Sequence, residues 1–134
     1  MKKFYLFTSF SIFLFAILWN GLVHMVILKE FNESVAYLRR VNQNEFFSLA
    51  LLMTALIAFL FSCSFLKWKK KDTVREDFAH ILFFSSLAGV LVDLNQWILY
   101  PIPAKTILLW FLFSILEFTV YQQIANFYYK KWIR

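Results

Sequence analysis

Four long apolar runs restrict the folds that this sequence can adopt. Two of them, 4–28 and 46–66, contain no Asp, Glu, Lys or Arg, while 78–100 and 104–129 each contain one carboxylate. About 20 helical residues, rising 1.5 Å each, cross the roughly 30 Å hydrocarbon core of a bilayer. We therefore predict an all-α integral membrane protein of four transmembrane helices, arranged as two antiparallel hairpins in a single membrane domain, residues 1–134.

The composition agrees with a chain that faces lipid. Hydrophobic residues make up 61% of its 134 positions and charged residues only 16%, whereas soluble domains are about 45–50% apolar. The net charge of +6 comes from bases that lie mainly at the ends of the apolar runs, where they meet anionic lipid headgroups. The expected partner is thus the lipid bilayer, and no nucleic-acid partner is expected.

The polar connections predict how the chain is oriented. An outer loop, 29–45, and a cytoplasmic loop, 67–77, separate the first three runs, and Pro101 and Pro103 enforce a tight reversal before the fourth. Ten bases fall on the side of the termini and the 67–77 loop, against four on the other side. Because cytoplasmic segments carry the excess of Lys and Arg, we predict a multi-pass protein with both termini in the cytoplasm.

The outer loop carries a short helical pattern. Phe31, Val35 and Leu38 follow a helical spacing, which predicts a short helix on the membrane surface or a continuation of the first span, with Asn32 as its N-cap. Arg39 and Arg40 follow this stripe. They are either a contact for a lipid headgroup or a partner, or part of a plain anchoring loop.

Polar residues inside the spans are the candidate site. A carboxylate in hydrocarbon costs about 2.5–3.5 kcal/mol even on the lenient insertion scale, so an unpaired one is a functional-site candidate. Counting helical rise from the outer ends places Asn20, His24, Asp93 and Gln96 in the outer half of the membrane. The same count places Glu117 slightly past its middle. The candidate residues, for a buried polar cluster or a proton relay, are Asn20, His24, Asp93, Gln96, Glu117 and Tyr121.

We expect these side chains to turn inward and pair with one another. Asp93 would pair with His24 or Asn20, and Glu117 with Tyr121 or with a serine of a neighbouring span, such as Ser62 or Ser85. The segments Leu22-Val23-His24 and Leu91-Val92-Asp93 also occupy matching places near the outer ends of the first and third runs. A parallel internal repeat, as some carriers use, is one interpretation of that match.

Three functions are compatible with this pattern. The first is a structural or partner-associating protein, as a homo-oligomer or with another membrane protein, held together by the polar cluster. The second is a small proton- or ion-coupled carrier working as an oligomer, in which His24, Asp93 and Glu117 form a descending series of titratable groups. The third is a membrane enzyme acting on a lipid or small molecule, with His24 as base, Asp93 orienting it and Ser48 as an imaginable nucleophile. We assign no catalytic residue.

Residue counts exclude several kinds of site. The single Cys63 rules out an internal disulfide and a paired-cysteine redox centre. Two histidines at opposite membrane depths do not provide the three or four ligands of a zinc site. The two glycines both lie inside apolar runs and cannot form a phosphate-binding loop. No cofactor or metal is therefore expected.

Overall fold

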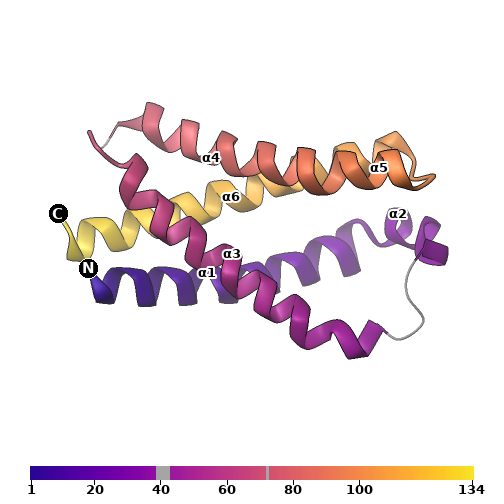
Figure 1. Ribbon diagram of the computed structural model, residues 1–134, viewed down its shortest axis with the longest axis horizontal. Helices are drawn as coiled ribbons and strands as arrows, with labels where there is room; N and C mark the ends of the chain where they lie inside the picture. Colours follow the sequence, from indigo (N-terminus) through magenta and orange to yellow (C-terminus); the bar gives the residue numbers. More distant parts are fainter. Residues whose placement is uncertain (39–42, 72) are drawn as a thin grey trace.

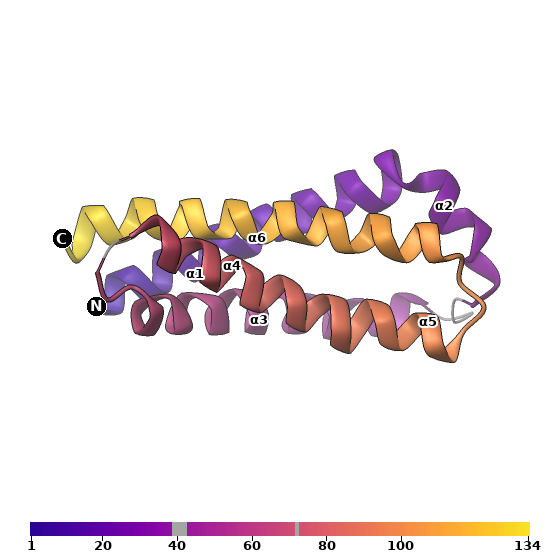
Figure 2. The same ribbon diagram turned by 90° about the horizontal axis from the view of Figure 1, so that it is seen from above.

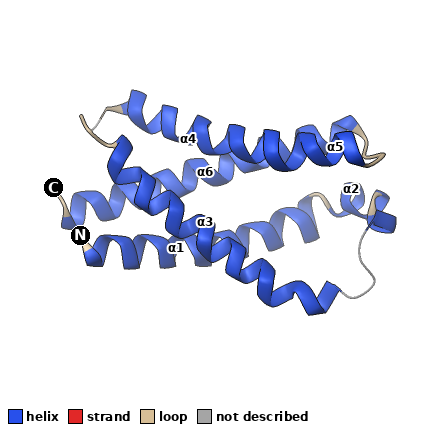
Figure 3. Cartoon of the chain, in the orientation of Figure 1, coloured by secondary structure: helices blue, strands red, loops and turns tan. Residues whose placement is uncertain are grey.

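The computed structural model describes residues 1–38, 43–71 and 73–134, which form helices joined by short connections (Figures 1 and 3). Within these ranges there is no β-strand. Arg39 and Arg40, the proposed headgroup or partner contact, lie outside the described residues.

Four helices are long and apolar enough to cross a membrane, as expected from the sequence, and the all-helical fold class is confirmed. They comprise Lys2–Ile27, Phe47–Trp68, Val74–Leu99 and Ala104–Trp132. Two are regular helices, α3 (Phe47–Trp68) and α6 (Ala104–Trp132).

The other two long helices each contain a π-helical segment. The first is α1 (Lys2–Leu22) followed by η1 (Val23–Ile27), and the third is α4 (Val74–Ala88), η4 (Gly89–Leu94) and α5 (Asn95–Leu99). Each π-helical segment therefore lies close to the end of its helix that is farther from the chain termini.

Local sequence explains where the third and fourth helices begin. The Thr73 side chain accepts a hydrogen bond from the Glu76 backbone, and the Glu76 carboxylate accepts one from the Thr73 backbone. This capping box starts α4 at Val74, before the predicted start at residue 78. Tyr100 has an extended backbone ahead of Pro101, and Pro103 immediately precedes α6, so the prolines reverse the chain as predicted.

The connection between the first two long helices is partly helical. It contains α2 (Lys29–Ser34) and the short 3₁₀ turns η2 (Ala36–Leu38) and η3 (Gln43–Phe46). The prediction of Asn32 as an N-cap is wrong, because α2 starts three residues earlier and Asn32 is buried within it.

The four long helices form an open ring in the order α3, α1, α6, α4 (Figures 1 and 2). Helix α1 packs along both α3 and α6, and α4 packs along α6, whereas α3 and α4 meet over a shorter length. Both chain termini lie at one end of the molecule, which we call the terminal end (Figure 1). The opposite end, which holds α2 and the Pro101–Pro103 turn, we call the loop end.

The hydrophobic core lies toward the terminal end. Its largest fully buried side chains include Phe4, Phe61 and Phe65, which pack with Phe118 and Tyr121. Toward the loop end, α3 diverges from α1 (Figure 1). There the side chains of α3 are largely exposed, among them Phe47 at 64% and Leu52 at 63%. The terminal end is thus well packed by the chain itself, and the loop end leaves much apolar surface uncovered.

Candidate functional site

Glu117 joins α6 to α1. Its Oε1 accepts a hydrogen bond from the Tyr121 hydroxyl, one of the two kinds of partner expected from the sequence, and another from Asn20 Nδ2 at 3.1 Å. The same Asn20 nitrogen donates to the Ala16 carbonyl at 2.9 Å. Tyr121 is buried. The carboxylate is therefore satisfied within the chain and fixes α1 against α6.

His24 belongs to a second group near the loop end. Asn32 Nδ2 lies 3.2 Å from His24 Nδ1 and donates to the His24 carbonyl oxygen at 2.9 Å. Trp110 Nε1 donates to Asn32 Oδ1 at 2.9 Å. Since an amide nitrogen can only donate, His24 Nδ1 is the acceptor in this contact. Asn32 thereby links η1, α2 and α6.

Asp93 stands apart from both groups. It lies in η4, is 8% exposed, and forms no hydrogen bond or ion pair with any residue in the described ranges. The predicted pairing of Asp93 with His24 or Asn20 is therefore wrong. The physical reason is that η4 packs against α6, while Asn20 and His24 find partners on α6 and α2.

The predicted single polar cluster divides into three separate places. Asn20, Glu117 and Tyr121 form one group, His24 forms another with Asn32 and Trp110, and Asp93 lies in a groove of its own. Gln96 lines a cavity of about 380 Å³ at the loop end, together with His24, Asn32, Tyr100 and Trp110. A continuous series of titratable groups from His24 through Asp93 to Glu117 is not formed.

Both π-helical segments carry an ionisable residue. His24 lies in η1 and Asp93 in η4, within the two triplets that match in sequence. π-Helical turns are rare and occur frequently at functional sites. This local geometry distinguishes His24 and Asp93 from Glu117, which lies in a regular helix.

Asp93 forms part of the wall of an open groove between the third and fourth long helices. The groove has a volume of about 340 Å³, and almost all of its other lining groups are apolar, including Val90, Trp97, Leu108 and Phe111. Gly89 brings the two helices close together there. A Cβ atom at Gly89 would lie 2.6 Å from Phe111 Cδ2. The groove thus places a carboxylate among apolar walls.

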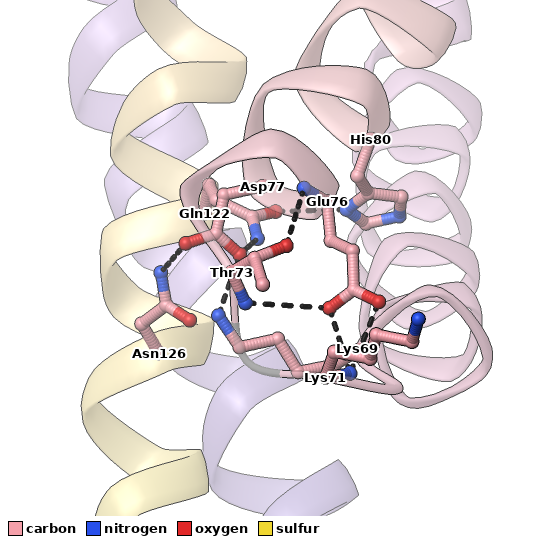
Figure 4. Close-up of polar contacts among 8 residues, drawn as sticks. All are labelled: Lys69, Lys71, Thr73, Glu76, Asp77, His80, Gln122 and Asn126. Carbon is pink, nitrogen blue, oxygen red and sulfur yellow. Dashed lines mark hydrogen bonds and ion pairs between the residues drawn. The ribbon is translucent and has the colours of Figure 1, made fainter.

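The terminal end holds a polar cluster that the sequence analysis did not identify (Figure 4). Lys69 Nζ lies 2.7 Å from Asp77 Oδ1, and the two side chains are 3% and 20% exposed. Gln122 Nε2 donates to the same oxygen at 2.6 Å, and Asn126 Nδ2 donates to Asp77 Oδ2 at 2.9 Å. Asp77 therefore accepts three donors and ties the end of α3 and the start of α4 to α6.

His80 extends this cluster into the core. It is fully buried, with its Nδ1 2.8 Å from Gln122 Oε1 and its Nε2 2.8 Å from the Ser64 hydroxyl oxygen. Because an amide oxygen can only accept, His80 Nδ1 carries a proton in this contact. The rings of Phe61 and Phe84 surround it, with centroids 4.4 and 5.1 Å away. A chain of hydrogen bonds thus runs from Ser64 through His80 and Gln122 to Asp77.

A depth count from the terminal end would have found this cluster. Asp77 and His80 are three residues apart at the start of α4, and Gln122 and Asn126 are four apart near the end of α6. Each pair shares a helical face, and antiparallel helices bring these two stretches to the same level. The sequence pattern instead predicted Lys69 within the cytoplasmic loop 67–77.

No protein-family model, no curated protein and no solved structure matches this chain. The geometry alone therefore carries the functional argument.

The arrangement imagined for a membrane enzyme is not assembled. His24 hydrogen-bonds Asn32 rather than Asp93, and Ser48 is an exposed residue on α3. Among the described residues, no three His, Cys, Asp or Glu side chains are grouped so that they could hold a metal ion. The arrangement offers a cavity at the loop end, lined in part by His24, Asn32 and Gln96, and a carboxylate in an apolar groove.

Proposed function

We propose that this chain is a small multi-pass membrane protein of two antiparallel hairpins that works by associating with another membrane-embedded helix. The observation that carries the proposal is Asp93, a nearly buried carboxylate that lies in an open apolar groove and forms no hydrogen bond or ion pair with the described residues. An ionisable residue in a membrane span is expensive and usually functional. The Glu117 carboxylate, by contrast, accepts hydrogen bonds from two donors of this chain, so Asp93 is the carboxylate that we propose for binding a partner.

The apolar surface of the helices supports the membrane setting. Only 17–22% of the most apolar window of each long helix is buried within the chain, and lipid or another helix must cover the remainder. The ten bases on the side of the two termini and the 67–77 segment, against four on the other side, favour a cytoplasmic terminal end.

Cysteine labelling of intact cells tests the topology. In a Cys63→Ala background, Glu33→Cys near the loop end should react with a membrane-impermeant maleimide added outside. Lys70→Cys at the terminal end should react only after permeabilisation. Both original side chains are exposed. The opposite labelling pattern would reverse the orientation, and equal labelling of both would contradict the membrane-spanning arrangement.

Site-specific cross-linking tests the association. Leu108 lies on the groove wall and is 56% exposed, whereas Leu18 on α1 is 74% exposed and does not line the groove. A photo-reactive maleimide on Leu108→Cys should give an adduct of discrete mass in native membranes, and the same label on Leu18→Cys should react only with lipid. Adducts at neither position would contradict the proposed function.

A small proton- or ion-coupled carrier working as an oligomer is the second candidate. The placement of His24 and Asp93 in π-helical segments favours it. The separation of the titratable groups into three places argues against a relay within one chain. Proton flux into vesicles containing the purified protein, lost in Asp93→Asn while the fold is kept, would favour the carrier over the partner-associating protein.

A further inference from the structure

The features of the groove beside Asp93 restrict the kind of partner that can bind there. Its apolar walls are formed by η4 and α5 on one side and by the first two turns of α6 on the other. Several wall residues are exposed, with Val90 at 57% and Leu108 at 56%. A partner that fits must cover apolar surface on both helices and offer something to the carboxylate between them.

A positive charge is the group that Asp93 lacks. The side chain is almost removed from the surface, and it has neither a hydrogen-bond donor nor a cation among the described residues. A buried charge is tolerated when it is paired. A cation placed in the groove would supply that pairing, and an apolar side chain there would leave the carboxylate as it is.

A second copy of this chain offers no lysine or arginine at that depth. The 14 lysines and arginines all lie outside the stretches 4–28, 46–66, 78–100 and 106–129. The two bases nearest the loop end within the described residues are already in contact with other groups. Lys29 Nζ lies 3.8 Å from Glu33, and Lys105 Nζ lies 5.2 Å from the centre of the Phe31 ring.

A helix fits the groove better than a lipid headgroup does. Asp93 precedes Tyr100 by seven residues, which places it about 10 Å along the helix from the loop end. Headgroup cations remain outside the hydrocarbon core, whereas a long basic side chain on a spanning helix can reach this depth. Ser86 and Gly89 on one wall and Ala104 on the other are small residues, which allow close approach of a helix backbone.

We propose that the Asp93 groove receives a single lysine or arginine side chain from a transmembrane helix of another protein. This inference rests on the proposed function, and it names the chemistry of the partner. The apolar face of the partner helix covers the groove walls, and its cation pairs with the Asp93 carboxylate. Since this chain has no such cation, the resulting assembly is a hetero-complex.

Designed peptides in lipid vesicles test the proposal with the full chain. The protein carries a donor fluorophore on its only cysteine, the partly exposed Cys63. Leucine-rich spanning peptides carry an acceptor and differ only in one residue about 10 Å from one end, arginine or glutamine. Energy transfer at increasing peptide-to-lipid ratio gives the affinity. The arginine peptide should bind about tenfold more tightly than the glutamine peptide.

Two variants assign that preference to a residue. In Asp93→Asn the arginine and glutamine peptides should bind equally. In Glu117→Gln, the matched control, the arginine preference should remain, because Glu117 is already occupied by Asn20 and Tyr121. An arginine preference that persists in Asp93→Asn, or none in the unmodified chain, would overturn the proposal.

The cross-linking and peptide-binding experiments together distinguish failure of this proposal from failure of the proposed function. Cross-links at Leu108 in native membranes without an arginine preference would overturn the basic partner and leave association standing. An arginine preference without such cross-links would uphold the groove chemistry and contradict the association in the cell.

Discussion

Asp77 and Asp93 lie on the same long helix and have opposite surroundings. Asp77, at the terminal end, accepts hydrogen bonds from Lys69, Gln122 and Asn126 (Figure 4). Asp93, toward the loop end, is less exposed than the Asp77 side chain yet accepts none from the described residues. The end of α3 and helix α6 supply donors for the Asp77 carboxylate, whereas the described residues supply none for the Asp93 carboxylate.

The difference separates a structural polar group from one that is available for binding. Polar groups that are fully satisfied fix the register of packed helices, and a partly satisfied network is a liability for the fold. The terminal end combines the Asp77 carboxylate, which accepts three donors, with the hydrophobic core, so it holds the molecule together. The loop end combines Asp93, two π-helical segments and exposed apolar side chains, and it is the part at which we propose that a partner helix binds.

Removal of the Asp77 carboxylate should have the largest effect on stability. Asp77→Ala removes the carboxylate oxygen that lies 2.7 Å from the Lys69 ammonium, a side chain only 3% exposed, and breaking a buried ion pair costs about 3–5 kcal/mol. The measurement is the free energy of unfolding in mixed micelles, followed by tryptophan fluorescence. Lys70→Ala, at an exposed neighbour, should change that energy by less than about 0.5 kcal/mol. An equal response of the two variants would remove Asp77 from its structural role.

Substitution of the two glycines by alanine gives a matched test and control for helix packing at the groove. In Gly89→Ala the new Cβ atom meets the Phe111 ring at 2.6 Å, and such overpacking should lower the free energy of unfolding by about 1–3 kcal/mol. In Gly21→Ala the new atom has no neighbour within 4 Å, and the gain in helix propensity should raise that energy by up to about 1 kcal/mol. The same unfolding assay measures both. If Gly89→Ala is neutral, the close approach of α6 to η4 is not required.

Asp93→Asn should have the smallest effect on the fold. It removes no hydrogen bond or ion pair seen in the described residues, and it replaces a costly carboxylate by a neutral amide. The free energy of unfolding should stay within about 0.5 kcal/mol of the unmodified value or rise. Glu117→Gln, which disturbs a carboxylate with two donors, should lose about 1 kcal/mol. A larger loss of unfolding free energy for Asp93→Asn than for Glu117→Gln would contradict the view that the described residues stabilise the Glu117 carboxylate and not the Asp93 carboxylate.

Local sequence patterns predicted the helices but not most of the polar contacts between them. The four apolar runs and the prolines after Tyr100 were sufficient to predict four long helices and the chain reversal, and the Glu117–Tyr121 spacing predicted one of the two alternative partners of Glu117. The Asn20–Glu117 contact joins residues 97 positions apart. It depends on how α1 and α6 are rotated about their axes, which apolar periodicity does not fix when most of each helix surface is apolar.

The Asp77 cluster shows a second reason why the polar contacts between helices were not predicted from the sequence. Its members are polar residues near helix ends, where a sequence favours solvated loops and headgroup contacts. Lys69 is nevertheless almost buried, because Asp77, Gln122 and Asn126 converge on one point. The capping box at Thr73 and Glu76, by contrast, is a local signal that could have placed the start of α4.

Apolar runs, prolines and flanking bases were enough to predict a chain with four helices long and apolar enough to span a membrane. Length, hydropathy and proline positions act within one segment, so no knowledge of neighbouring helices is needed. Which carboxylates find partners became visible when the helices were placed against one another. Hydrogen bonds between helices depend on the relative rotation and depth of residues far apart in the chain, and these placed Asp77 and Glu117 among donors and left Asp93 in an open groove.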